Sequence, residues 1–117
     1  MALTLTTRCS GNLCIANLEG QLTLGPMLLR LSREVDSALT HSNATGLILD
    51  LSKLSDIDSA GLGELVNIYK SATDRQCRVA VSGATARTRE LFDVTRLNEF
   101  FSCFDDEAAA ELALRRG

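Results

Sequence analysis

Alternating apolar and polar positions at the start of the chain predict two β-strands. Residues 4–9 read Thr-Leu-Thr-Thr-Arg-Cys, and residues 13–18 form a more apolar run, Leu-Cys-Ile-Ala-Asn-Leu. The polar residues 10–12, with Gly11 at their centre, separate the two runs in a way that is typical of a hairpin turn. We therefore expect the fold to open with a β-hairpin.

The next segment changes to the spacing of a helix. Thr23 is a suitable N-cap, and Pro26 suits the first turn. The apolar positions that recur at helical spacing are Leu24, Leu28, Leu31, Val35 and Leu39. After a polar break, residues 46–51 (Gly-Leu-Ile-Leu-Asp-Leu) form a short apolar run, which predicts a strand buried on both faces.

The rest of the chain alternates between helical and strand patterns. Residues 52–58 predict a loop, and residues 59–72 a helix with the apolar stripe Leu62, Leu65, Val66, Tyr69 and Ala72. Strands are expected at residues 77–81 and 100–104, a helix at 85–95, and a terminal helix capped by Asp105. The fold class is α/β: a mixed β-sheet of about five strands, opened by a hairpin and covered by about four helices.

Length and composition fit one globular domain. A chain of 117 residues suffices for a single domain, 1–117, and 45% apolar with 23% charged residues argues against disorder. The longest aliphatic run, residues 47–49, is far shorter than the roughly 20 residues that span a bilayer. No export signal is visible at the N-terminus, so we expect a cytoplasmic protein with no membrane insertion.

The chain carries few groups suited to catalysis. It has one histidine, no tryptophan, and four cysteines at positions 9, 14, 77 and 103, none spaced as Cys-x-x-Cys. This argues against a zinc ribbon or a dithiol redox centre and favours free thiols in a reducing compartment. Whether Cys9 and Cys14 face each other across the hairpin stays open. We expect no metal, no cofactor and no enzymatic activity.

The charge is weakly acidic overall and uneven. The net charge is -3, yet residues 75–96 contain five arginines against Glu90 and Asp93. A strip of this kind is most often a solvated helix face, and it has no interleaved aromatic residues on which bases would stack. We expect no direct binding of nucleic acid.

The junction before the second helix is the most informative segment. Ser59 stands where that helix begins, and as an N-cap it would contribute about 1 kcal/mol. Gly61 and Gly63 each cost roughly 1 kcal/mol inside a helix, so we expect a neighbouring strand or a partner's surface to approach the backbone there. A phosphoryl group on Ser59, close to Asp56 and Asp58, would change the local charge sharply, which suits a binding switch.

Several segments together resemble a known family. They are residues 20–22 (Gly-Gln-Leu), 49–51 (Leu-Asp-Leu), 58–63 (Asp-Ser-Ala-Gly-Leu-Gly), 79–83 (Val-Ala-Val-Ser-Gly) and 91–97 (Leu-Phe-Asp-Val-Thr-Arg-Leu). The chain resembles the STAS domain family, named for sulfate transporters and anti-sigma factor antagonists, and in particular its single-domain bacterial antagonists. The resemblance implies that Ser59 is phosphorylated by a partner that is both anti-sigma factor and ATP-dependent serine kinase. It further implies that the unphosphorylated form binds this partner and frees a sigma factor for transcription, and that a serine phosphatase resets the switch.

The resemblance also implies a docking surface made of the second helix and the loop before the first helix. Its partner-binding residues would be Thr23, Leu24, Gly25, Asp56, Asp58, Ser59, Gly61, Gly63, Glu64 and Asn67. Two positions depart from the family pattern. Thr23 stands where an acidic residue is common. Arg96 stands where a glycine is common, and we expect it either to cap the third helix or to shift a turn.

Three other functions are alternatives to a phosphorylated anti-sigma factor antagonist. A receiver domain with Asp50 as phosphoacceptor would need an acidic cluster after the first strand and a late lysine, which the chain lacks. A serine hydrolase would need the Gly-x-Ser-x-Gly elbow around Ser59 and would depend on His41 alone as base. A non-phosphorylated STAS adaptor subunit of a transporter or sensory complex stays open as the alternative.

Overall fold

Five strands form one mixed sheet in which their spatial order is the same as their order in the chain. The structure is a computed structural model that describes residues 2–116. The strands are β1 (Thr4–Ser10), β2 (Leu13–Leu22), β3 (Gly46–Ile57), β4 (Arg78–Ser82) and β5 (Ser102–Phe104). β1 and β2 pair antiparallel, and every later pair is parallel. The predicted mixed sheet with an opening hairpin is confirmed.

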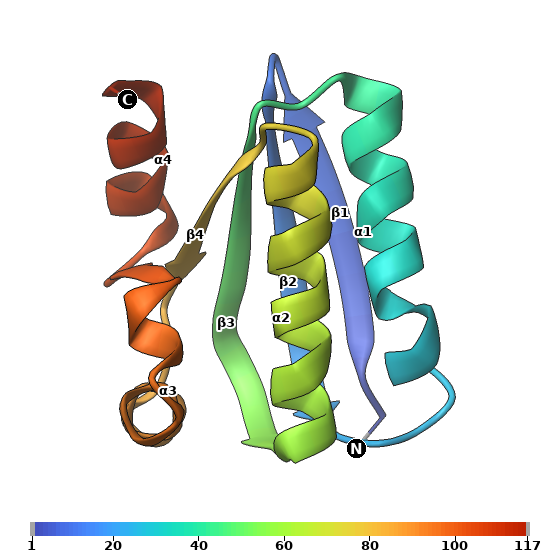
Figure 1. The fold of residues 1–117 in the computed structure, drawn as a ribbon, viewed down its shortest axis with the longest axis vertical. Coiled ribbons are helices and arrows are strands. Elements are labelled where there is room, and N and C mark those ends of the chain that lie inside the picture. Colours follow the sequence, from blue (N-terminus) through green and yellow to red (C-terminus); the bar gives the residue numbers. More distant parts are fainter. Residues whose placement is uncertain (1, 117) are drawn as a thin grey trace.

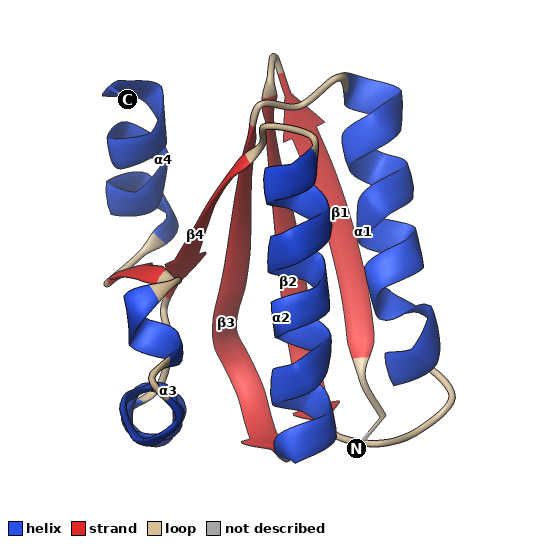
Figure 2. Ribbon diagram, viewed as in Figure 1, coloured by secondary structure: helices blue, strands red, loops and turns tan. Residues whose placement is uncertain are grey.

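Helices connect the parallel strands and follow the last one. They are α1 (Leu28–Ser42), α2 (Ser59–Asp74), α3 (Ala86–Thr95) with a single 3-10 turn, η1 (Leu97–Glu99), and α4 (Glu107–Arg116). Figure 1 shows α1 and α2 side by side along the strands, both running in the same direction. Figure 2 shows the same alternation of strand and helix, which confirms the predicted α/β class.

The two faces of the sheet carry cores of different size. The larger core lies between the sheet and the inner faces of α1, α2 and α3, and contains Leu49, Leu65 and Phe92. A smaller cluster on the other face joins Ile15 and Ile48 to Ala110 of α4. The side chains of a strand alternate between faces, so the strongly apolar β2 and β3 can serve both cores at once.

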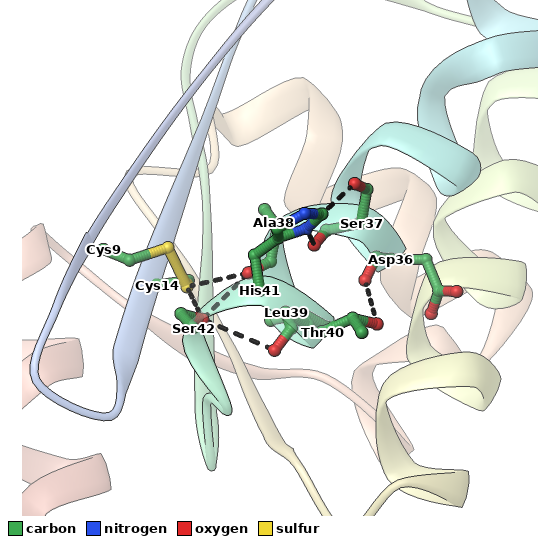
Figure 3. The surroundings of a disulfide bond; sticks show 9 residues. All are labelled: Cys9, Cys14, Asp36, Ser37, Ala38, Leu39, Thr40, His41 and Ser42. Carbon is green, nitrogen blue, oxygen red and sulfur yellow. Dashed lines mark hydrogen bonds between the residues drawn. A yellow bond between two sulfur atoms is a disulfide. The ribbon is translucent and has the colours of Figure 1, made fainter.

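The opening hairpin contains a feature that the cysteine spacing left open. Ser10 pairs with Leu13, so the loop has two residues, and Cys9 and Cys14 stand directly opposite each other. They form a disulfide, which Figure 3 shows beside the last turn of α1. The prediction of free thiols is therefore wrong for this pair, because the short loop sets a register that brings the two side chains together. Cys77 and Cys103 are free.

Helix α1 begins five residues later than the predicted N-cap. Its first residue is Leu28, and Met27 at the N-cap position makes no side-chain hydrogen bond. Residues 23–27 form a turn that contains Pro26, and Leu24 is 72% exposed instead of buried. The rest of the predicted apolar face, from Leu28 to Leu39, is buried as expected.

Two other predicted boundaries also move. Residues 52–57, predicted as a loop, continue β3 as far as Ile57, which pairs with Leu22. The carboxylate that accepts a hydrogen bond in the first turn of α4 belongs to Asp106, which bonds Ala109 N at 2.8 Å. Asp105, the predicted cap, instead forms an ion pair with Arg89 at 3.2 Å.

Helix α2 is rotated slightly from the face that the pattern predicted. Its buried residues are Gly61, Leu65, Ile68 and Ala72. Val66 and Tyr69, which the apolar stripe placed in the core, are only half-buried and lie at the side of the helix that faces η1 and Phe100. This rotation leaves apolar side chains at a surface that the sequence had assigned to the interior.

Candidate functional site

The N-terminus of α2 is built on the paired ends of β2 and β3, which extend beyond β4. The residue that caps the helix is Asp58, in extended backbone conformation, and its Oδ1 accepts a hydrogen bond from Gly61 N at 2.8 Å. Ser59 was predicted as the cap and is instead the first residue of the helix. This shift of one residue matters because Asp58 caps the helix, so the Ser59 hydroxyl does not have the capping role that was predicted for it.

Asp58 also holds the loop before α1 against the start of α2. Its Oδ2 accepts a hydrogen bond from Leu24 N at 3.1 Å, and its own N donates to Leu22 O at 3.3 Å. The hydrogen bonds from Gly61 N and Leu24 N hold the pKa of the Asp58 carboxyl below its ordinary value, because both stabilise the charged form. The residue is therefore an anion at neutral pH that ties two segments together.

The Ser59 side chain is exposed at this junction. Within residues 2–116 its hydroxyl makes no hydrogen bond, since the N–H of Gly61 is taken by Asp58. An exposed hydroxyl with no internal partner is free to be modified or to bond to another molecule. Nothing in the fold of the described residues explains why a serine stands at this position.

The two glycines of the first turns have opposite surroundings. A Cβ added to Gly61 would lie 2.0 Å from Leu22 O, so the neighbouring strand approaches the helix backbone here and requires a glycine. A Cβ added to Gly63 would meet nothing within 4 Å beyond its own helix, among the residues described. Of the two causes that the sequence left open, the neighbouring strand accounts for Gly61 and leaves Gly63 unexplained.

The structure brings most of the other predicted residues to the same end of the molecule. Thr23 and Gly25 are half-buried in the loop beside the exposed Leu24, and Glu64 (half-buried) and Asn67 (exposed) continue along α2 from Ser59. Asp56 is turned toward α3, where its Oδ1 lies 3.7 Å from Arg87 Nη2. Gly61 is buried and thus belongs to the support of the site, not to its surface.

The arginine strip of residues 75–96 is not one surface. Arg75 pairs with Asp36 of α1, Arg87 with Asp56 of β3, and Arg89 with Asp105, while Arg78 donates to Leu114 O of α4. Arg96 caps α3 with φ of 62°, a left-handed conformation that glycine favours, which explains why a glycine is common at this position but not why this chain has an arginine there.

The residues of the discarded alternatives have structural roles. Asp50 accepts hydrogen bonds from Ser52 N at 2.9 Å and Asn17 Nδ2 at 3.0 Å. Burial raises the pKa of Asp50, but the interaction with the Glu107 side chain and the hydrogen bonds from Ser52 outweigh that effect and lower it overall. His41 contacts Ser37 O at 2.8 Å in the last turn of α1, which Figure 1 places at the opposite end of the helices from the start of α2.

A search of family sequence models matches residues 4–110 to the STAS domain. Among curated proteins, the anti-sigma-B factor antagonist of Listeria monocytogenes is 38% identical over 53 residues, which is 45% of this chain. That alignment covers 46% of the relative, so the match spans about half of its length. No helix within residues 2–116 combines the length and the apolar character needed to cross a membrane.

Solved structures of similar fold cover almost the whole chain. An anti-sigma factor antagonist from Mycobacterium paratuberculosis superposes with a TM-score of 0.82 at 19% identity, over 97% of this chain and 95% of that one. The phosphorylated form of the Bacillus cell fate determinant SpoIIAA superposes with a TM-score of 0.71 at 18% identity, over 96% and 99% of the two chains. Likeness at such low identity establishes a shared fold.

Proposed function

Since this chain belongs to the STAS domain family, we propose that it is an anti-sigma factor antagonist switched by phosphorylation of Ser59. In its unphosphorylated form it binds an anti-sigma factor that is also a serine kinase, and this binding releases a sigma factor for transcription. A serine phosphatase restores the binding form. The chain is a binding partner and a kinase substrate in the cytoplasm, not itself an enzyme.

The exposed hydroxyl of Ser59 is the observation that carries this proposal. A serine at the start of a helix is ordinarily explained by capping, but here Asp58 is the cap and leaves Ser59 without that role. The hydroxyl faces solvent at the first residue of α2, where a kinase can reach it without unfolding the domain. The relatives named anti-sigma factor antagonists and the phosphorylated state of SpoIIAA support the same assignment.

Phosphorylation would place its charge on the surface of the helix. The Ser59 oxygen forms a bond to the γ-phosphorus of ATP, ADP leaves, and the hydroxyl proton passes to the kinase. The new group carries about -1.5 to -2 charge. Asp58 already uses Gly61 N and is itself anionic, so the helix terminus has little left with which to neutralise the phosphate. The charge of the phosphate is therefore exposed to a protein that docks on α2.

Gly63 indicates where the partner comes closest. The fold of the described residues does not require a glycine there, and a helix loses roughly 1 kcal/mol by having one. A glycine one turn beyond Ser59 lets a partner's backbone or side chain lie flat against α2. The loop of Thr23, Leu24 and Gly25, held to α2 by Asp58, forms the second part of the docking surface.

The test uses the purified chain and the serine-kinase anti-sigma factor encoded in the same genome, with ATP. Intact-mass and peptide measurements should find one phosphate on Ser59, and none on Ser59→Ala. Ser37→Ala, which removes an exposed hydroxyl from α1, is the matched control and should be phosphorylated as fully as the unaltered chain. A phosphate on another residue, or none at all, would contradict the proposal.

Binding measurements test the switch itself. We expect Ser59→Asp to raise the dissociation constant for the anti-sigma factor at least about tenfold, because burying a second carboxylate beside Asp58 without a cationic partner costs more than about 1 kcal/mol. Ser59→Ala should bind as tightly as the unaltered chain. If both variants bind equally well and no phosphate is found, the non-phosphorylated adaptor is the better description.

A further inference from the structure

A small apolar groove opens beside α2, away from Ser59 and its loop. It is lined by Val66, Tyr69, Lys70, Leu97, Phe100 and Phe101 and has a volume of about 130 Å³. A cavity for a small molecule usually has roughly 300 to 1,000 Å³, so this groove is too small for one. Its size and apolar lining fit a single aliphatic or aromatic side chain. We call it the α2–η1 groove.

The walls of the α2–η1 groove are held by aromatic packing. The ring of Tyr69 meets Phe100 and Phe101 edge-on, with centroid distances of 5.8 and 5.4 Å, and Phe101 stacks on Phe92 at 5.5 Å. Phe101 is buried, whereas Phe100 is 55% exposed at the rim. Such contacts hold rings in fixed orientations, so the hollow is part of the folded surface.

The groove lies on the same stripe of α2 as the proposed docking surface. Ser59, Gly63, Val66 and Lys70 are spaced i, i+4, i+7 and i+11, which puts them on one face of a helix. At about 1.5 Å per residue, Val66 lies only roughly 10 Å from Ser59 along the axis. A typical interface covers about 800 Å² on each partner, a patch some 30 Å across, so a partner centred on Ser59 and Gly63 is large enough to cover the groove as well.

The charges along this stripe are arranged with opposite signs at its two ends. Asp58 lies at the Ser59 end, and Lys70 at the groove end is exposed and takes part in none of the ion pairs found among residues 2–116. A partner that docks along α2 is therefore favoured if it carries a carboxylate near Lys70. Complementary charge of this kind fixes the direction in which a partner lies.

We propose that the α2–η1 groove receives an apolar side chain of the anti-sigma factor, next to a carboxylate that pairs with Lys70. The inference rests on the proposed function for the identity of the partner. It adds a second anchor that does not depend on the state of Ser59. Aromatic side chains that pack against a partner are common among the residues that contribute most to binding, and Phe100 with Tyr69 would contribute in this way here.

The experiment compares matched variants in binding to the same anti-sigma factor. Phe100→Ser should raise the dissociation constant at least about tenfold, while Leu112→Ser, at a 56% exposed leucine on α4, should change it less than about twofold. Lys70→Glu should raise it about three- to tenfold, more at low salt, whereas Lys53→Glu at the only other lysine should have little effect. Lys70→Glu alters an exposed helix position and stays informative if Phe100→Ser fails to fold.

The possible outcomes separate this inference from the proposed function. If the unaltered chain binds and both groove variants bind equally well, the groove is not an anchor and the inference fails alone. If the groove variants weaken binding but Ser59→Asp does not, the anchor stands and the phosphorylation switch fails. If the unaltered chain does not bind the anti-sigma factor, both fail. If Phe100→Ser converts a dimer to a monomer in sedimentation, a second copy fills the groove and the inference is overturned.

Discussion

Individual residues at the start of α2 divide into those that support the fold and those that are free of it. Gly61 and Gly63 show the division most clearly, because the backbone of Leu22 confines the first and nothing beyond its own helix confines the second. Gly61→Ala should therefore destabilise the domain by about 2 kcal/mol through overpacking. Gly63→Ala should stabilise it by roughly 0.5–1 kcal/mol. Urea unfolding of both variants measures these changes.

Gly61 and Gly63 also allow the stability of the domain to be compared with its binding of the partner. If Gly63 lies on the proposed docking surface, Gly63→Ala should weaken binding of the anti-sigma factor although it makes the domain more stable, because the added methyl group stands on that surface. A Gly63→Ala variant that binds with unchanged affinity would show that this glycine does not serve the partner. A stable Gly61→Ala variant would show that the approach of Leu22 can relax.

Asp58 predicts a dependence of stability on pH. Its folded pKa lies below the ordinary value of 3.8, so its contribution is complete above about pH 4 and is lost as the pH falls through the folded pKa. Asp58→Asn should be less stable than the unaltered chain at about pH 7, and this difference should shrink below about pH 4. Denaturant unfolding over this range provides the measurement, with Asp74→Asn at the far end of α2 as the control for losing one charge. A difference that stays constant into strong acid would rule out the charged form of Asp58 as its cause.

Sequence reasoning selected the segment that contains the candidate site and assigned the helix cap to the wrong residue within it. Asp and Ser are nearly equal as N-caps, so Asp58 and Ser59 could not be distinguished by propensity. The choice was made by tertiary contacts, since only Asp58 is placed to accept from both Gly61 N and Leu24 N. The two glycines drew attention to this segment, but only the structure separates Gly61, which packs against Leu22, from Gly63, which is open.

Among the elements, the opening hairpin shows that the register of two strands determines whether two cysteines can form a disulfide. Gly11 takes a positive φ of 62° at the first position of a two-residue loop, as type II′ turns favour. A three-residue turn over residues 10–12 would have paired Cys9 with Leu13 and Cys14 with Arg8, whereas the two-residue loop places the two cysteines opposite each other. The disulfide thus follows from one residue's difference in turn length.

The disulfide predicts a modest loss of stability on reduction. Closing a loop of about six residues contributes about 2 kcal/mol in the chain-entropy estimate, and the paired backbone of β1 and β2 persists without it. Urea unfolding with and without reductant should show this difference, and Cys9→Ser should be insensitive to the reductant. Thiol counting in denaturant should find two thiols before reduction and four after. Four thiols before reduction would show that the bond does not form.

The free cysteines should differ in reactivity within the folded domain. Burial raises the pKa of the Cys77 thiol to about 11, so almost no thiolate exists near neutral pH. Cys103 is partly exposed, and we expect an alkylating reagent to label it well before Cys77. Peptide mass analysis after brief labelling measures the order. Equal labelling of both residues would show that the strand around Cys77 opens readily.

The local pattern of apolar and polar residues could not predict the boundaries of α1 and β3. Leu24 continues the helical spacing of α1 perfectly well, but its N–H is held by Asp58, which keeps residues 23–27 in a turn. Residues 52–57 have the composition of a loop, yet they continue β3 because β2 extends beside them to Leu22. In both cases a contact distant in sequence overrides local preference.

The whole molecule is a sheet whose stability should be greatest at its middle strands. β2 and β3 are flanked on both sides, and Leu47, Ile48 and Leu49 are almost completely buried. Hydrogen exchange followed by mass spectrometry should therefore find the slowest amides in β2 and β3 and the fastest strand amides in the three-residue edge strand β5. Fast exchange in β3 would contradict this arrangement of the core.

At this scale the sequence predicted the class of fold and its element order, because strand and helix patterns alternate plainly after the hairpin. It could not predict the α2–η1 groove. Val66 and Tyr69 are apolar at helical spacing and so were assigned to the core. Their half-buried state arises from how α2 is rotated over the sheet and from the aromatic side chains that residues 100 and 101 bring against it.

The strands have the same order in space as in the chain, and this affects how the protein can fold while the ribosome synthesises it. Each strand pairs with the one synthesised just before it, and no later strand has to insert between two that already exist. The sheet can thus grow in one direction while translation continues, first the hairpin, then β3 and β4, with each connecting helix packing on a face of the sheet. Ser59, the proposed phosphorylation site on α2, is synthesised midway along the chain, after β2 and β3, on whose ends α2 is built.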